Sequence, residues 1–278
     1  MNVFYQYKEL NLAKNNCAAK SIGLVPTMGA LHEGHITLVK RALEDNDLVL
    51  VSIFVNPTQF DNKNDLKNYP KNLNTDLSKL LSLGGNVWVY APEADDLYTT
   101  KVESKTYDFG KLETTMEGAH RKGHFQGVAT VVQKLFEALK PTTAYFGEKD
   151  YQQLQIITAL VKQEKIPVEI TPCPIIRHED GLAMSSRNER LNKKERALAP
   201  IIYETLQKAV ALKEEHSPAQ IEAWVTDFFS LHPDFDLEYF SIADSLSLEK
   251  VSHLNGSKTR AFIALKLGGV RLIDNIKF

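Results

Sequence analysis

Short apolar runs alternate with longer amphipathic stretches over roughly the first 174 residues. The apolar runs have the length of buried β-strands, and between them apolar residues recur at helical spacing. The runs occupy residues 22–25, 48–55, 87–90, 144–146 and 168–170. Strands that alternate with helices predict an α/β fold with a Rossmann-like parallel sheet and covering helices.

The clearest helix is predicted for residues 124–140. Apolar side chains recur there at one face, and Pro141 ends the pattern because proline cannot continue a helix. The face consists of Val128, Val131, Val132, Leu135, Phe136 and Leu139. It must pack on a large surface, which in this fold is the sheet.

The pattern changes after residue 174. Charged helical segments follow at 193–214 and 219–229, and strand-like runs at 237–242 and 260–267. We therefore expect two domains: residues 1–174, Rossmann-like, and residues 175–278, a smaller α+β domain that closes over the active site. The polar stretch 61–74 is the one long linker-like segment.

Composition narrows the class of protein. The chain has 33 Lys and Arg against 35 Asp and Glu, a formal charge of −2, which gives no bulk electrostatic reason to bind nucleic acid or an acidic membrane. Cys17 and Cys173 stand far apart, so neither a disulfide framework nor a thiolate metal site is expected. No signal peptide or membrane span is recognisable, and a cytoplasmic protein is the expectation.

A turn at residues 26–35 carries the strongest chemical signal. His32 and His35 lie where the strand at 22–25 gives way to an amphipathic helix. A helix N-terminus offers unpaired NH groups, and Gly29 and Gly34 allow a phosphate to approach the backbone. Two imidazoles there can donate hydrogen bonds to an oxyanion, so the turn predicts a nucleotide site.

Two other interpretations of the histidines remain open. His32 can cap the helix while His35 packs half-buried on the sheet. A catalytic zinc site is the second, but it needs a third ligand, and the pair lacks the i, i+4 spacing of helical zinc motifs.

Polar residues also follow two other predicted strands. Asn56 and Gln59 come after the strand at 48–55, at the carboxyl end where open α/β sheets bind ligands, and neutral amides there suit a hydroxylated substrate. An ordinary Asn-Pro turn is the alternative. Lys149 follows the strand at 144–146, where an ammonium can neutralise polyphosphate charge, while Asp150 can serve as a helix N-cap.

Two loops complete the candidates. Residues 177–188 offer hydroxyl and guanidinium donors that can fold over phosphates, with a solvated linker as the alternative. Residues 117–121, which include Glu117 and Arg121, are a weaker candidate and can be a surface turn.

Several strings carry a family resemblance. The His-x-Gly-His turn and the Met-Ser-Ser-Arg loop resemble the HIGH and KMSKS signatures of the nucleotidyltransferase superfamily, which includes class I aminoacyl-tRNA synthetases. The strings PTMGALHEGH, VSIFVNPTQF, YFGEKDYQQL and DGLAMSSRNERL, between residues 26 and 191, together resemble the pantothenate synthetases, the pantoate-β-alanine ligases of coenzyme A biosynthesis. The remaining length suits that family's short C-terminal domain.

The resemblance implies a reaction. ATP, pantoate and β-alanine would be the substrates, a pantoyl-adenylate the intermediate, and pantothenate, AMP and pyrophosphate the products. It also implies Mg²⁺ bound mainly through the ATP phosphates, and a homodimer in the cytoplasm. From the charge and the lack of an apolar span, no nucleic-acid or membrane partner is expected.

The resemblance further implies roles for residues of this chain. His35, His32, Lys149 and Arg187 would be catalytic. Pantoate would lie at Gln59, Gln153 and Asn56, with β-alanine also near Gln59. ATP would bind Met28, Gly29, Ala30, Leu31, His32, Glu33, Gly34, His35, Gly147, Glu148, Lys149, Asp150, Ile176, Met184, Ser185, Ser186 and Arg187.

Two points of the resemblance leave roles open. Glu117 and Arg121 match a family segment near the active site. Some relatives carry clustered acids where this chain has Asn74, Thr75 and Asp76, so no protein ligand is assigned to the metal. Because a mixed anhydride must be shielded from water, the polar segments 61–74 and 177–187 are candidates for a closing loop.

Three competing functions share some of these features. A nucleotidylyltransferase acting on a phosphate would share the turn and the fold but ignore β-alanine. An aminoacyl-tRNA synthetase fragment would need an RNA-binding surface, which the charge of −2 and the short C-terminal region do not favour. A non-enzymatic regulator would bind ATP without releasing pyrophosphate.

Overall fold

The computed structural model describes residues 1–61, 63–98, 101–254 and 258–278, which form two compact units. The N-terminal unit comprises Met1–Phe109, His120–Glu148 and Gln153–Pro174. The C-terminal unit comprises Gly110–Ala119, Lys149–Gln152 and Ile175–Phe278. Two short segments from before residue 174 therefore belong to the C-terminal unit. That this unit closes over the active site stays a prediction.

The N-terminal unit is built on a six-stranded sheet in the order β1-β4-β3-β2-β5-β6, with every pairing parallel. The strands are β1 (Asn2–Phe4), β2 (Ile22–Thr27), β3 (Leu48–Ile53), β4 (Val87–Tyr90), β5 (Thr143–Gly147) and β6 (Glu169–Cys173). The five predicted strands and the Rossmann-like class are confirmed. The edge strand β1 was not predicted, because it has only three residues and none is fully buried.

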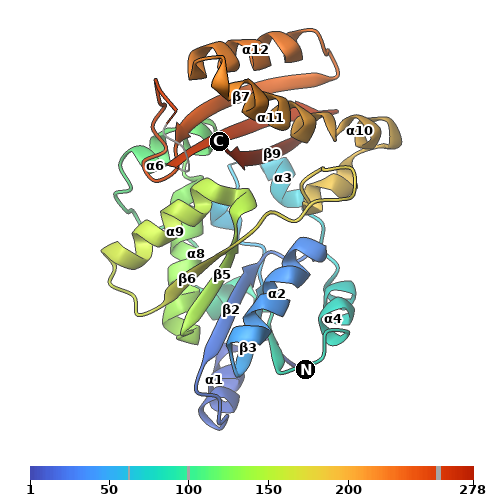
Figure 1. Cartoon of the computed structure of the whole chain (residues 1–278). Helices are drawn as coiled ribbons and strands as arrows, with labels where there is room; N and C mark the ends of the chain where they lie inside the picture. The colour runs from blue at the N-terminus through green and yellow to red at the C-terminus, as the bar shows by residue number, and fades with distance from the viewer. Residues whose placement is uncertain (62, 99–100, 255–257) are drawn as a thin grey trace. The chain divides into compact units, whose positions relative to one another are not determined.

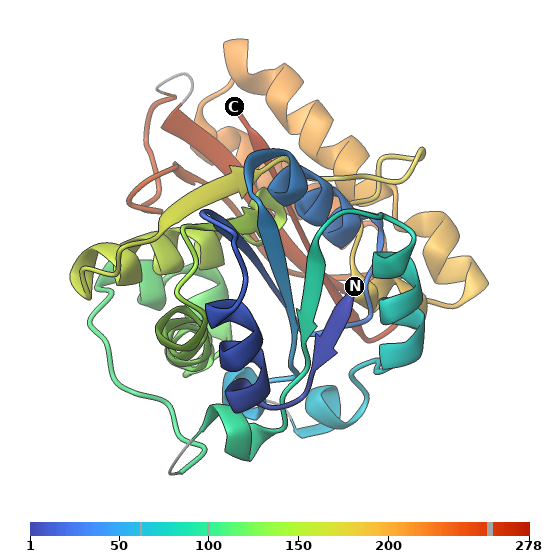
Figure 2. The same cartoon turned by 90° about the horizontal axis from the view of Figure 1, so that it is seen from below.

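Helices cover both faces of this sheet (Figures 1 and 2). On one face Ile36 and Val39 of α2 (Glu33–Asp45) pack with Val25 and Val49. On the other face lie α1 (Tyr7–Asn15) and α8 (His124–Leu139), joined where Lys14 Nζ donates to the carbonyl of Leu139 at 2.9 Å. The helix predicted over 124–140 is confirmed, and its apolar residues are buried.

The linker expected over residues 61–74 was wrong in part. The helix α3 (Lys63–Lys67) lies within it, and α4 (Leu73–Leu81) begins before its end, while Asn62 lies outside the described residues. The N-cap Asn72 starts α4 by accepting from the amide of Thr75 at 3.1 Å. The capping residue Asn72 marks this helix start, and Leu77 and Leu80 of the same helix pack against the core. The remaining helices before residue 174 are η1 (Pro57–Gln59), α5 (Ala94–Leu97), α6 (Lys111–Thr114), α7 (Met116–His120), η2 (Glu148–Asp150) and α9 (Tyr151–Gln163).

The C-terminal unit contains a three-stranded antiparallel sheet in the order β7-β8-β9. The predicted runs at 237–242 and 260–267 fall in β7 (Phe235–Asp244) and β8 (Thr259–Leu267), whereas β9 (Val270–Lys277) was not predicted. The single helix expected over 193–214 is divided near Pro200, because proline supplies no amide hydrogen to the preceding turn. The helical elements are η3 (Ser186–Arg190), α10 (Lys193–Leu198), α11 (Ile201–Ala211), η4 (Leu212–Glu214) and α12 (Pro218–Ser230).

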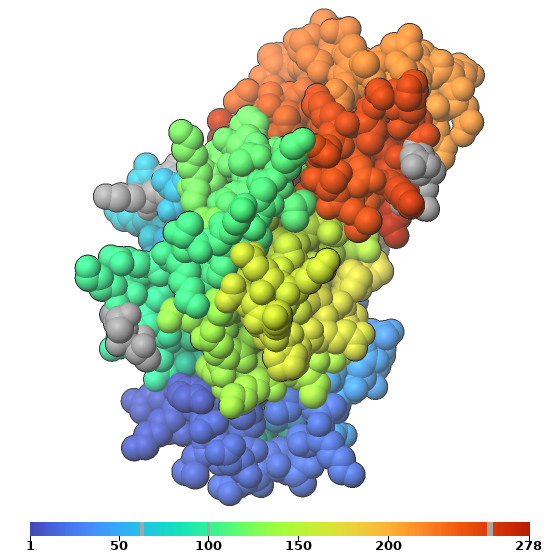
Figure 3. All heavy atoms as spheres, turned by 90° about the vertical axis from the view of Figure 1, so that its left-hand side faces the viewer, coloured from blue at the N-terminus to red at the C-terminus, as the bar shows by residue number. Residues whose placement is uncertain are grey.

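The two faces of this small sheet explain which segments join it. Ile263 and Leu272 on one face pack with Leu206 of α11 and Val225 of α12. On the other face Phe262 packs in a separate cluster with apolar residues of 110–119 and 149–152, namely Leu112, Met116 and Tyr151. Figure 3 shows α6 in green against the red C-terminal segment, where Lys111 pairs with Glu249. The two early segments therefore complete the core of the C-terminal unit.

None of the helices within the described residues is both long and apolar enough to cross a membrane.

The environment of Cys173 predicts its reactivity. This thiol is 4% exposed, and burial raises its pKa to about 11, so its reactive thiolate fraction at pH 8 is only about one in a thousand. We expect iodoacetamide at pH 8 to label the half-buried Cys17 well before Cys173, as measured by peptide mass spectrometry. The urea-unfolded chain, in which both thiols should react alike, is the control. Equal labelling rates in the folded protein would contradict the burial of Cys173.

Candidate active site

The sheet order creates a switch point between β2 and β5. The chain runs from β2 outward through β3 and β4, and β5 then pairs on the opposite side of β2. Open parallel sheets bind ligands at the carboxyl ends of the strands beside such a point. The turn that carries His32 and His35 follows β2, and Gly147 ends β5, so these candidates flank the switch point.

The backbone of the turn after β2 is held by a buried carboxylate. Gly29 and Ala30 both have positive φ, +79° and +50°, and a Cβ on Gly29 would lie 3.0 Å from Asp76 Oδ2. Asp76, only 2% exposed, accepts from the amide of Ala30 at 3.0 Å and from the amide of Leu31 at 2.7 Å. These two amides are thus engaged by the protein itself, and Leu31 lies in the core.

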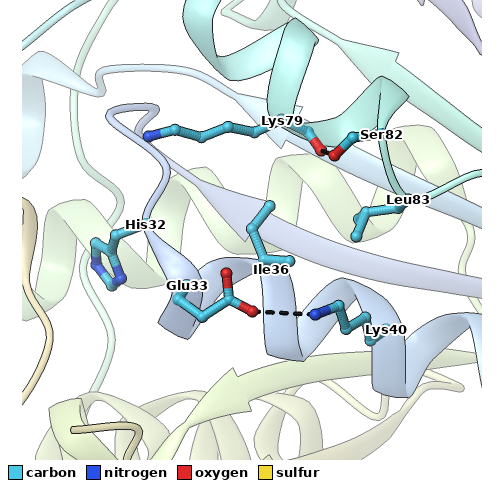
Figure 4. Close-up of a pocket in the computed structure, with 7 residues that line it drawn as sticks. All are labelled: His32, Glu33, Ile36, Lys40, Lys79, Ser82 and Leu83. Carbon is cyan, nitrogen blue, oxygen red and sulfur yellow. Dashed lines mark hydrogen bonds and ion pairs between the residues drawn. The ribbon is translucent and has the colours of Figure 1, made fainter. Parts of the chain in front are cut away.

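Lys79 of α4 adds a second restraint, since its ammonium donates to the carbonyl of Leu31. A cavity of about 370 Å³ lies beside it, with His32 at its edge (Figure 4). Lys40 also lines the cavity, and its ammonium pairs with Glu33 at 3.0 Å. Both lysines that line it therefore already contact protein oxygens.

The two imidazoles lie together at the start of α2. Their ring centroids are 4.0 Å apart, His32 is the N-cap residue, and the backbone amide of His32 donates to Nδ1 of His35 at 3.3 Å. Because Nδ1 accepts, the proton of neutral His35 resides on Nε2, which makes Nε2 a hydrogen-bond donor. The capping interpretation is thus correct in its geometry for His32, and the bond to Nδ1 places the proton of His35 on Nε2.

The amides after β3 form a buried network. Asn56 Nδ2 donates to Gln59 Oε1 at 3.3 Å and to the carbonyl of Gly127 at 3.1 Å, and Asn56 Oδ1 accepts from the Tyr98 hydroxyl at 2.7 Å. Gln59 Nε2 in turn donates to Met28 Sδ at 3.0 Å. Asn56 also caps η1, so the segment is a turn as well as a candidate substrate site. The contact with Met28 links the turns after β2 and β3.

A histidine absent from the predicted site supports Gln59. His124 Nδ1 donates to the carbonyl of Gln59 at 2.8 Å, since a carbonyl can only accept. In the neutral ring Nε2 is then an acceptor, and Arg121 Nη1 lies 3.0 Å from it. Gly127, one turn further along α8, permits this packing, because a Cβ there would lie 2.4 Å from the carbonyl oxygen of Thr58.

The remaining candidates fall in different units. Gly147, Glu148 and Gln153 belong to the N-terminal unit, with Glu148 and Gln153 half-buried. Lys149 and Asp150 belong to the C-terminal unit; the side chain of Lys149 is 17% exposed, and its ammonium lies 3.7 Å from Asp150.

The loop with Ile176, Met184, Ser185, Ser186 and Arg187 is well ordered by hydrogen bonds. The Met184 amide donates to the carbonyl of Ile176 at 2.9 Å, and Ser185 caps η3 by accepting from the Arg187 amide at 3.3 Å. Arg177 anchors the loop through two bonds to Asp274, at 2.6 and 2.9 Å. The solvated-linker interpretation is therefore wrong for this loop.

Glu117 is not in a surface turn. It is 7% exposed, accepts from Arg271 at 2.7 Å through both carboxylate oxygens, and accepts from the Tyr239 hydroxyl at 2.8 Å. Burial opposes the charge of Arg271, but its bonds to Glu117 and Glu238 outweigh this and raise the arginine pKa. Burial, with the nearby Glu117 charge, raises the pKa of Tyr239. This carboxylate thus holds α7 to the C-terminal sheet.

The described part of the chain offers no third ligand for a zinc site. No group of three His, Cys, Asp or Glu side chains within it comes together as a metal site. Asp76, the one acid among Asn74, Thr75 and Asp76, has both oxygens on backbone amides.

These features indicate a class of protein. The N-terminal unit has a parallel sheet with a His-x-Gly-His turn after the strand at its switch point, and the C-terminal unit has a hydrogen-bonded Met-Ser-Ser-Arg loop; both features are typical of HIGH-type nucleotidyltransferases.

Comparison with known proteins gives the family. A family model described as pantoate-beta-alanine ligase matches residues 2–277. The chain is 54% identical over 258 residues to a pantothenate synthetase of Christiangramia forsetii, which covers 92% of this chain and 91% of the relative. It is 46% identical over 281 residues to a pantothenate synthetase of Bacteroides fragilis, with coverage of 100% and 99%.

Solved structures agree. The pantothenate synthetase of Thermus thermophilus has a TM-score of 0.93 and 37% identity, and the match covers 100% of this chain and 99% of that one. A pantoate-beta-alanine ligase of Francisella tularensis, solved in complex with beta-gamma ATP and β-alanine, has a TM-score of 0.84 and 37% identity, with 100% and 97% covered. The chain belongs to the pantoate-beta-alanine ligase family, and it is a ligase that joins pantoate to β-alanine.

Replacing Asp76 should loosen the turn. In Asp76→Asn the amide group must face either Ala30 NH or Leu31 NH, so one buried donor loses its acceptor. We expect a loss of about 1–3 kcal/mol in the free energy of unfolding, measured by urea denaturation, together with weaker ATP binding in calorimetry. Glu44→Gln is the matched control, because Glu44 is exposed and lies 4.0 Å from Arg41. Unchanged stability and ATP binding in Asp76→Asn would contradict the restraint.

Proposed function

We propose that the chain condenses pantoate with β-alanine through a pantoyl-adenylate, with ATP as the second substrate and AMP and pyrophosphate as by-products. The observation that carries this proposal is the histidine pair at the start of α2, where the amide of His32 donates to His35 Nδ1 and so keeps a proton on Nε2. A fixed donor at a helix N-terminus suits a phosphate on which negative charge develops.

Activation of the carboxylate explains the need for ATP. A carboxylate does not react with an amine at neutral pH, because oxide would have to leave. Attack of a pantoate carboxylate oxygen on the α-phosphorus forms the acyl-phosphate bond and breaks the bond to pyrophosphate, which takes the electron pair. AMP then becomes the leaving group of the next step.

The first step builds negative charge that this chain can offset. His35 donates from Nε2, and His32 lies against it with ring centroids 4.0 Å apart. Lys149 and Arg187 are the cationic groups that we assign to the phosphates. Gln59, with Asn56 and Gln153, is assigned to the pantoate hydroxyls, and the bond from His124 to its carbonyl fixes the position of Gln59.

In the second step the amine of β-alanine attacks the pantoyl carbonyl and displaces AMP, and the amine loses a proton as the amide forms. Much of this acceleration should come from positioning. The Francisella tularensis relative solved with beta-gamma ATP and β-alanine supports both substrates.

We propose that Mg²⁺ binds mainly through the ATP phosphates. Asp76 has both oxygens on the amides of Ala30 and Leu31, and no group of three His, Cys, Asp or Glu side chains comes together among the described residues. We therefore assign Mg²⁺ no protein ligand. We also propose that the enzyme acts as a homodimer in the cytoplasm, as the family resemblance implies. Sedimentation equilibrium of the purified protein tests the dimer.

The assay that tests the function follows AMP and pantothenate in reactions with ATP, Mg²⁺ and pantoate, with and without β-alanine. We expect pantothenate only when β-alanine is present. A stable adenylylated product that ignores β-alanine would instead indicate a nucleotidylyltransferase. ATP binding without pyrophosphate release would indicate a regulator.

Variants of His35 separate its two roles. In His35→Asn the side-chain oxygen can replace Nδ1 and keep the bond from His32 NH, but the Nε2 donor is lost. We expect stability and ATP binding near those of the wild type, with kcat lower by roughly a hundredfold to a thousandfold. His35→Gln, which places an amide donor near the Nε2 position, should recover part of the rate.

The control for these variants is His216→Ala, an exposed histidine after η4, which should leave kcat unchanged. Full activity in His35→Asn would remove the Nε2 donor from the mechanism.

A further inference from the structure

A side chain outside the predicted site holds the backbone of Lys149. Asn275 of β9 is 2% exposed, and its Nδ2 donates to the carbonyl of Lys149 at 3.0 Å. Its Oδ1 accepts from the guanidinium of Arg260 in β8. The side-chain amide of Asn275 thus donates to Lys149 and accepts from a buried arginine.

The surroundings make this amide a rigid support. Arg260, also 2% exposed, lies over the ring of Tyr151 with 4.0 Å between the guanidinium carbon and the ring centroid. The Tyr151 ring contacts Phe262, the partner of Asn275 in the register of β8 and β9, at a centroid distance of 5.8 Å. The residues from Lys149 to Tyr151 are therefore fixed at both ends, by a hydrogen bond and by ring packing.

Asp274, the residue before Asn275, also holds a segment that is distant in the sequence. Asp274 is 4% exposed and holds Arg177, which begins the loop toward Met184 and Arg187, and the Asn275 amide donates to Asp274 Oδ1 at 2.7 Å. Successive residues of a strand point to opposite faces, so this pair reaches two separate segments. Both segments carry residues that the proposed function assigns to ATP.

We propose that Asn275 is a positioning residue for Lys149: its side-chain amide fixes the Lys149 main chain so that the ammonium is held where charge develops on the phosphates. This inference rests on the proposed function for the role of Lys149. The contact of Asn275 with Lys149 is independent of that function, and the experiment separates the two.

The test is a double-mutant cycle with Asn275→Asp and Lys149→Ala. The aspartate keeps an acceptor for Arg260 but has no donor, and its oxygen meets the carbonyl of Lys149. We expect the rate of pyrophosphate release to fall on the order of tenfold to a hundredfold, with the KM for pantoate within about twofold of the wild type. In the Lys149→Ala background the same substitution should change the rate by less than about twofold, because non-additivity marks residues that act together.

Affinity for ATP, measured by calorimetry on the same four proteins, gives a readout that needs no turnover. Asn192→Asp is the matched control: it adds the same charge to the same unit, and an aspartate can still accept from the Glu195 amide as the N-cap of α10. Asn275→Ser, which removes the donor without adding charge, is the second variant if Asn275→Asp does not fold.

The outcomes are distinct. Equal factors in the wild-type and Lys149→Ala backgrounds, in rate and in ATP affinity, would indicate a structural role and overturn the inference. Wild-type behaviour of both Asn275 variants would also overturn it. If the wild-type protein bound ATP but made no pantothenate, the proposed function would fail, while a non-additive ATP affinity would still support the positioning by Asn275.

Discussion

The turn that carries the histidines depends on one interaction: the Asp76 carboxylate accepts hydrogen bonds from two backbone amides. Gly29 and Ala30 both adopt positive φ, and neither Ala30 nor Leu31 can use its amide in a helix or strand. An amide buried without an acceptor costs about 1–3 kcal/mol, so such a turn persists only if acceptors are supplied from elsewhere. Asp76 supplies both from a distant helix, α4. The start of α2, and hence the position of both imidazoles, follows from this restraint.

In the C-terminal unit, buried carboxylates likewise hold segments that are distant in the sequence. Two of its buried carboxylates are paired with arginines of distant segments: Asp274 with Arg177, and Glu117 with Arg271, while Glu117 also accepts a hydrogen bond from Tyr239. Removing one member of such a pair leaves an uncompensated buried charge, which is far more destabilising than the loss of an exposed ion pair. These pairs join β9 to segments that lie far away in the sequence. The stability of the unit and the placement of its candidate site residues therefore depend on the same contacts.

Much of the fold could be predicted from the sequence, because its strands are apolar runs between helical patterns. Strands β2 to β6 and the long α8 follow from that signal. The strand β9 was not predicted because Asp274 and Asn275 interrupt its apolar alternation. These two residues make long-range polar contacts. The roles of Asp76, His124 and Asn275 were equally hidden, since each depends on a partner between 45 and 126 positions away. Family motifs identified the candidate residues, but only the folded chain shows what holds them.

The histidine pair shows why the capping and catalytic interpretations need not compete. A neutral imidazole has one donor and one acceptor nitrogen, and the N-terminus of a helix has backbone amides that require acceptors. When His35 Nδ1 accepts from the His32 amide, one of these amides has its acceptor and the ring's remaining proton is placed on Nε2. The bond that begins α2 therefore also selects the tautomer. The donor that the proposed mechanism assigns to His35 therefore requires no extra structural element, because the bond at the start of the helix already orients the ring.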